Sequence, residues 1–205
     1  MRMLLPFALV AGLLPFQTPA PQAPTPPAGT RTPAVSPKKS ENPDDANAAV
    51  IKEFLARVNG YVALHKKLED TLPPLPKQTN PQVIDEHERA LGKLIQKERG
   101  NAKQGDLFTP AMQAFVRRVL APVFSGTDGA HMRTEILDNE YKGSVKLAPN
   151  ARYPDVIPVS TVPPQVLQNL PKLPEELEYR FVRQNLILFD PHAHTIPDWV
   201  PRAFK

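Results

Sequence analysis

The 205-residue chain has no cysteine, and this absence excludes two ways of holding a protein in place. No disulfide can cross-link the fold, and no lipid can be attached to a cysteine behind an export signal. Long hydrophobic runs are also missing, because the longest, residues 4–16, is shorter than the roughly 20 residues that a membrane-spanning helix needs. Glycine does not occur after Gly143, and aromatic residues make up only 7% of the chain. Ordinary burial of apolar side chains must therefore stabilise the folded part.

The N-terminus has the order of features that is typical of an export signal. Arg2 supplies a positive charge, residues 4–16 form the apolar segment, and Ala20 is a small residue near which cleavage is expected. We predict a signal peptide at 1–20 and an exported protein, periplasmic or secreted, without stable membrane insertion after cleavage. An uncleaved membrane anchor is the alternative.

Proline, threonine and alanine dominate residues 21–43. This segment has too few large apolar side chains to offset the entropy lost on ordering, and its prolines favour extended conformations. We predict a disordered proline-rich linker that leads to a folded part beginning at residue 44.

The formal net charge of +4 belongs mostly to the N-terminal segment. Residues 1–43 contain four basic residues and one acidic residue, so the rest of the chain carries a net charge of only +1. The basic pairs Lys66-Lys67 and Arg117-Arg118 are isolated. Nucleic-acid binding requires a basic stripe or patch, so we predict no nucleic-acid partner.

Residues 44–142 show the three- and four-residue apolar spacing of amphipathic helices. The first helix is expected over 46–71 with Asp44 or Asp45 as its cap, and the second over 81–99 with Thr79 or Asn80 as its cap. A third begins after Thr109 and ends at Pro122, and a weaker fourth covers 128–141. The short connections predict a small antiparallel bundle of three to four helices.

Residues 143–205 differ from the helical part by their recurring prolines and, later, by a two-residue periodicity. Residues 144–176 are expected to wrap around the domain in extended form, with a short helix at 165–169. Residues 177–182 and 186–190 predict a β-hairpin with Asn185 as the left-handed residue of its turn, and 194–200 predicts a last short strand. Because an isolated hairpin is marginally stable, it should pack on the helices, which makes 44–142 and 143–205 one α+β domain.

His192 and His194, with Asp190 close by, form the best candidate site in the sequence. In an extended segment, side chains two residues apart point to the same side. Two imidazoles and a carboxylate are a common ligand set for zinc, nickel or copper. The spacing sets neither a third nor a fourth ligand, so ordinary residues at a strand edge are the alternative.

His65 and His87 lie on the apolar stripes of two different predicted helices. One interpretation brings them together around a metal or around a carboxylate such as Asp85 or Glu69. The other makes them hydrogen-bonded residues of the core or its boundary.

Two pairs of carboxylates, Asp85-Glu86 and Glu175-Glu176, are of the kind that acid–base catalysis uses. Both pairs lie near predicted helix starts, where acidic side chains simply complement the helix dipole. No phosphate-binding glycine loop or dinucleotide fingerprint is present. The sequence therefore contains no complete catalytic set.

Residues 173–182, followed by Leu186-Ile187-Leu188, resemble the closing hairpin of small exported bacterial proteins. Together with the turn at 105–110, they make the body of the chain similar to a family of uncharacterised exported bacterial proteins. The hairpin alone is also similar to that of periplasmic proteins linked to nickel and cobalt homeostasis, although it lacks the glycines of such hairpins. No functional residue is transferred by either resemblance.

The leading hypothesis is a non-catalytic periplasmic binding domain whose partner is an unknown protein or envelope component, with no cofactor. The alternative is a periplasmic metal-binding protein that uses the His192/His194 segment. A second alternative is a cell-envelope hydrolase. The oligomeric state does not follow from the sequence.

Overall fold

The computed structural model describes residues 42–78, 80–138, 145–157 and 160–205, which belong to one compact unit. The elements within these ranges are α1 (Pro43–Glu69), α2 (Pro81–Glu98), α3 (Pro110–Val123), α4 (Gly126–Asp138), β1 (Ala151–Arg152), α5 (Pro164–Leu167), β2 (Glu178–Val182), β3 (Asn185–Phe189), β4 (Thr195–Ile196) and β5 (Trp199–Val200). Helices combined with small antiparallel sheets confirm the predicted α+β class. The predicted signal peptide and almost all of the predicted linker lie outside the described residues.

Each of the first three helices begins at a proline that directly follows a capping side chain. The capping residues, which each accept a backbone N–H, are Asn42, Asn80 and Thr109. The caps predicted for the second and third helices are thereby confirmed. The prediction of Asp44 or Asp45 as the first cap was wrong, because Pro43 fits the first turn and leaves the preceding residue to cap the helix.

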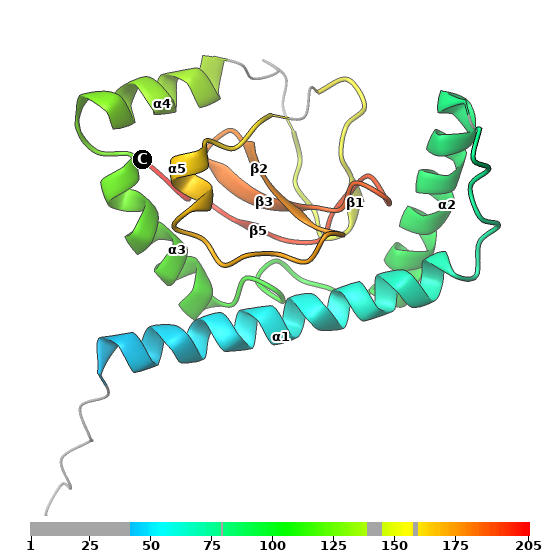
Figure 1. Cartoon of the computed structure of the whole chain (residues 1–205), viewed down its shortest axis with the longest axis horizontal. Coiled ribbons are helices and arrows are strands. Elements are labelled where there is room, and N and C mark those ends of the chain that lie inside the picture. The colour runs from blue at the N-terminus through cyan, green and yellow to red at the C-terminus, as the bar shows by residue number, and fades with distance from the viewer. Residues whose placement is uncertain (1–41, 79, 139–144, 158–159) are drawn as a thin grey trace, which may run out of the picture. The chain divides into compact units, whose positions relative to one another are not determined.

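Helices flank the three-stranded sheet, as Figure 1 shows, and α1 crosses beneath the sheet. α3 lies near the N-terminal half of α1, and α2 lies near the C-terminal end of α1. The buried residues of α1 are Phe54, Val58, Tyr61, Val62, His65 and Leu68, which confirms most of the predicted stripe. On α2, Leu91 and Ile95 are buried, but Ile84 is 38% exposed. The apolar spacing predicts a stripe of Ile84, His87, Leu91 and Leu94 on this helix; it is confirmed at Leu91 and at Leu94, which packs against the core, and wrong at Ile84, because only the C-terminal half of α2 contributes buried residues.

The predicted hairpin is confirmed as β2 and β3, paired from Glu178 opposite Phe189 to Val182 opposite Asn185. Its left-handed residue is Arg183, with φ of 56°, rather than Asn185. The side chain of Asn185 instead donates a hydrogen bond to the Val182 carbonyl at 3.0 Å. The turn is thus one residue shorter than expected, and its two central positions precede Asn185.

The strand predicted over 194–200 is divided into β4 and β5, which belong to different sheets. β4 pairs with β1, and β5 pairs with β3. Pro197 lies between them and has no N–H to donate to a ladder, so the chain leaves one sheet and joins the other at this point.

Asp198, in the crossing between β4 and β5, is buried and binds the turn before α3. Its carboxylate accepts backbone N–H groups from four residues at 2.8 to 2.9 Å, namely Gly105, Leu107, Phe108 and Trp199. Gly105 takes a φ of +95°, which other residues rarely adopt, and this conformation brings its N–H to the carboxylate. Asp198 therefore has a structural role, and it does not join the histidines near which it lies in the sequence.

Candidate functional site

The site is built first on α1, which places Tyr61, His65 and Glu69 on one face at successive intervals of four residues. Tyr61 and His65 are buried, and the Glu69 side chain is 32% exposed at the end of the helix. The helix therefore leads from the core to the surface along a row of polar side chains.

The second part of the site is the turn formed by residues 190–195, hereafter the 190–195 turn. Asp190 and Thr195 close it through reciprocal backbone hydrogen bonds of 2.9 and 3.1 Å. Its buried residue Asp190 accepts the Tyr61 hydroxyl at 2.6 Å and contacts His65 Nδ1 at 2.7 Å through Oδ2. Oδ1 accepts the Ala193 N–H at 2.9 Å. Because an ionised carboxylate only accepts, His65 Nδ1 must carry the proton, which leaves Nε2 pointing the other way.

Around Glu69, these two parts form a group that we call the His/Glu cluster, consisting of His65, Glu69 and His192. His65 Nε2 lies 3.2 Å from Glu69 Oε2, and His192 Nδ1 lies 3.3 Å from Glu69 Oε1. The ligand atoms of the cluster all lie within 4.8 Å of one another, so they could hold a metal ion. The exposed fraction increases from 0% for the His65 side chain to 51% for that of His192, so the cluster opens to solvent on one side.

The two carboxylates around His65 control its protonation. Burial lowers the pKa of His65, but the hydrogen bond and the negative charge of Asp190, with a smaller effect of Glu69, raise it above the usual value overall. Burial, and then the Asp190 charge, raise the pKa of Tyr61 well above its usual range, so the hydroxyl stays protonated as a donor. Without a metal, the two carboxylates therefore favour the protonated form of the His65 ring.

The arrangement is compatible with a metal ligand that has a supporting carboxylate. A histidine that binds a metal through one nitrogen usually donates its other N–H to a carboxylate, which orients the ring. Asp190 has this position behind His65, and Glu69 and His192 supply further donors of the type that zinc binds.

His194 does not join the cluster, although the sequence predicted that it would point to the same side as His192. That prediction was wrong, because the segment is a turn rather than an extended strand, and His194 takes a left-handed backbone with φ of 49°. The His194 ring contacts Tyr153 and Phe189 edge-on instead. Of the three candidates in that segment, His192 is in the cluster, Asp190 supports it, and His194 belongs to a different group.

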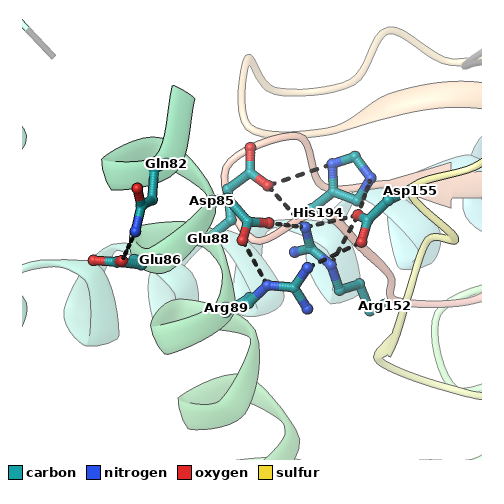
Figure 2. A network of polar contacts seen from close by, with 8 residues as sticks. All are labelled: Gln82, Asp85, Glu86, Glu88, Arg89, Arg152, Asp155 and His194. Carbon is teal, nitrogen blue, oxygen red and sulfur yellow. Dashed lines mark hydrogen bonds and ion pairs between the residues drawn. The ribbon is translucent and has the colours of Figure 1, made fainter. Parts of the chain in front are cut away.

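That group is a set of polar contacts between α2 and the segment around β1, hereafter the Arg152 network, which Figure 2 shows. Its members are Asp85, Glu88, Arg89, Arg152, Asp155 and His194. Arg152 Nη2 lies 2.6 Å from Asp85 and 2.8 Å from Asp155, and Arg89 contacts the same two carboxylates. His194 lies 3.6 Å from Glu88 and 3.7 Å from Asp155, beyond hydrogen-bonding distance.

Ion pairing accounts for one carboxylate of each pair that the sequence singled out. Asp85 pairs with the two arginines of the network, and Glu176 lies 2.6 Å from Lys66 Nζ. Hydrogen bonds, from Arg89 to Asp85 and from Lys66 to Glu176, lower the pKa of these carboxyls. Such groups stay ionised and neutralised, which does not suit a general acid.

The structure brings His65 and His87 to one carboxylate, Glu69, as the sequence interpretation allowed. The sequence did not indicate that Asp190 would support His65, or that His192 would meet them. The one local signal is the four-residue spacing of His65 and Glu69, which places both side chains on the same face of a helix.

Comparisons with protein-family models, with curated proteins and with solved structures found no match to this chain. The family resemblances inferred from the hairpin therefore stay predictions. Among the described residues, no helix has the length and apolar character that crossing a membrane requires.

Proposed function

We propose that this protein is an exported metal-binding protein whose folded domain holds a divalent transition-metal ion, zinc in the first place, at the His/Glu cluster. The observation that carries the proposal is the convergence of His65, Glu69 and His192 within 4.8 Å. The metal-binding alternative from the sequence used His192 and His194. In the site proposed here, His192 stays a ligand, and His65 and Glu69 replace His194.

The composition of the cluster supports zinc. Two imidazoles and one carboxylate are an established zinc ligand set, with bonds of about 2.0 to 2.2 Å. Ligand atoms around a tetrahedral ion at that bond length lie roughly 3.3 Å apart. Each imidazole nitrogen lies at about this spacing from a different oxygen of Glu69, His65 Nε2 at 3.2 Å from Oε2 and His192 Nδ1 at 3.3 Å from Oε1. An ion would bind by drawing the ligand atoms, which lie within 4.8 Å of one another, to this spacing.

Export is supported by the N-terminal sequence, in which a charged start precedes a short apolar segment and a proline-rich stretch. A hydrolase is less well supported, because one carboxylate of each pair is engaged, Asp85 with arginine and Glu176 with lysine. A purely protein-binding domain has no specific observation in its favour.

Calorimetric titration of the purified full chain with zinc, nickel and copper salts tests the proposal. The informative variant is His192→Ala, because this ligand is 51% exposed and its loss should leave the fold intact. The matched control is His131→Ala, which removes an exposed histidine of α4. We expect the wild type and the control to bind zinc alike, and His192→Ala to bind at least about tenfold more weakly.

Equal affinities for His192→Ala and the control, or no binding by the wild type, would contradict the proposal. Loss of binding in His194→Ala with retention in His192→Ala would indicate a site around His194 instead.

A further inference from the structure

The His/Glu cluster offers an ion three protein ligands, which is one fewer than a closed zinc site has. Within the described part of the chain, the group whose ligand atoms all lie within 4.8 Å of one another consists of His65, Glu69 and His192. His87 approaches Glu69 to 3.8 Å but lies outside this group. Structural zinc is held by four protein ligands, whereas zinc held by two histidines and a glutamate keeps its fourth position open. The composition of the cluster is therefore that of an open site.

The three ligands are covered to different degrees, and this sets the side from which the ion can be reached. The His65 side chain is fully buried, whereas those of Glu69 and His192 are partly exposed. Asp190 covers His65 on the side of the core, since its carboxylate contacts His65 Nδ1 and also accepts the Tyr61 hydroxyl. An ion in the cluster is thus covered on the side of His65 and open to solvent on the side of Glu69 and His192.

The charges around the ion favour an anion as its fourth ligand. Two neutral imidazoles and one carboxylate leave a divalent ion with a net positive charge, and a bound cation is often the largest local charge in its site. Asp190 is also negative, but it lies behind the His65 ring, so it offsets the charge of the ion less than a directly bound group would. A small anion neutralises the remaining charge, whereas water does not.

We propose that an ion in the His/Glu cluster keeps its fourth coordination position open to solvent, and that a small anionic ligand takes this position in exchange for water. This inference rests on the proposed function and specifies how its site is used. The anion forms one bond to the ion, the bond to one water molecule breaks, and no oxidation state changes. Ligand exchange suits the site better than catalysis does, because catalytic groups act best where water is excluded and His192 is half exposed.

The exchange has a direction that the exposure of the ligands sets. When the anion is one arm of a chelator, its other arms displace the protein ligands in turn. His192 is the most exposed of the three ligands and is displaced first, and His65, which Asp190 holds from behind, is displaced last. The site then passes its ion to and from small molecules and does not lock it into the fold.

X-ray absorption of the zinc-loaded full chain counts the imidazoles directly and requires no variant. Two imidazoles, with oxygen donors in the remaining positions, support the inference. Three or more imidazoles overturn it, because a further histidine such as His87 then closes the site.

Cobalt in place of zinc gives the fourth position a visible signal, because the absorption of Co(II) depends on its ligands. Sodium azide is added to the cobalt-loaded full chain, and we expect a change in the visible spectrum that saturates with azide concentration. His131→Ala removes an exposed histidine of α4 and is the matched control for cobalt on surface imidazoles, so it should respond as the wild type does. A spectrum of the cobalt-loaded wild type that azide leaves unchanged overturns the inference.

The outcomes separate the two proposals. Zinc binding that His192→Ala weakens, together with three imidazoles or with no response to azide, overturns the open position but keeps the site. Absence of zinc and cobalt binding by the wild type overturns both. If zinc binds and cobalt does not, the imidazole count in the zinc-loaded wild type decides.

Discussion

Asp198→Asn tests whether one buried carboxylate holds the C-terminal strands to the turn before α3. The carboxylate accepts four backbone N–H groups, from Gly105, Leu107, Phe108 and Trp199. An asparagine of the same shape keeps one oxygen, which has two lone pairs, and turns an NH₂ group toward the remaining donors. Two backbone N–H groups therefore lose their acceptor.

A buried donor without a partner costs about 1 to 3 kcal/mol, so the two together cost about 2 to 6 kcal/mol. Relaxation of the turn and entry of water reduce this cost, and we expect a loss of about 2 to 4 kcal/mol in the free energy of unfolding. Small domains have only about 5 to 15 kcal/mol in total, so the effect is large.

Urea unfolding at neutral pH measures this loss, with the fluorescence of Trp199, the single tryptophan, as the signal. Asp106→Asn is the matched control, because within the described part of the chain this exposed carboxylate of the same turn accepts a single hydrogen bond, from the Lys103 N–H at 2.8 Å. The control should change the unfolding free energy by less than about 0.5 kcal/mol. If Asp198→Asn were as stable as the control, the four contacts would not be what stabilises this junction.

Two further predictions concern acid stability and helix packing. Hydrogen bonding to Arg152 lowers the pKa of Asp155, and hydrogen bonding to Arg89 lowers that of Asp85. Their stabilisation is therefore complete above the unfolded-state pKa near about 4 and is lost as the pH falls through the lower folded-state values. Urea midpoints of the wild type and of Arg152→Gln, measured across this pH range, test this account. At neutral pH the variant should have the lower midpoint, and in acid the two midpoints should converge. A difference in midpoint that does not change with pH would argue against the ion pairs. Gly92→Ala should lower the free energy of unfolding by about 1 kcal/mol, because the added Cβ meets a backbone oxygen of the 190–195 turn at 3.1 Å. Gly60→Ala on α1 should raise the free energy of unfolding by about 0.5 to 1 kcal/mol, because the added Cβ enters open space and alanine favours the helix. Equal thermal shifts for the two variants would contradict this account.

The helical half of the fold could be predicted because its signals are local. The stripe that contains Phe54, Val58 and His65 repeats with the period of a helix, and prolines next to Asn80 and Thr109 define two helix starts. The hairpin could be predicted for the same reason, from alternation along the chain. The left-handed residue could not, because the register decides which residues are central in the turn, and the register depends on packing.

The site could be predicted only in part, because its members come from distant segments. His65 and Glu69 are four residues apart on one helix, but Asp190 lies 125 residues from His65 in the chain, and His192 lies 123 residues from Glu69. Only the tertiary packing brings the 190–195 turn to the end of α1. The expectation that His192 and His194 act together was wrong because it assumed an extended strand, and the turn directs the two rings to different groups.

Asp190 is the residue that joins the fold to the proposed chemistry. Through Oδ2 it orients His65 and binds Tyr61 on α1, and through Oδ1 it holds the Ala193 N–H within the turn that carries His192. The same carboxylate therefore sets which nitrogen of one ligand is free and shapes the segment that supplies another. A metal site built on long side chains alone would lose entropy each time an ion bound, whereas ligands already held by a buried carboxylate lose little. This preorganisation of the His65 ring suits the proposed site, whereas an accidental meeting of surface charges would need no support from the core.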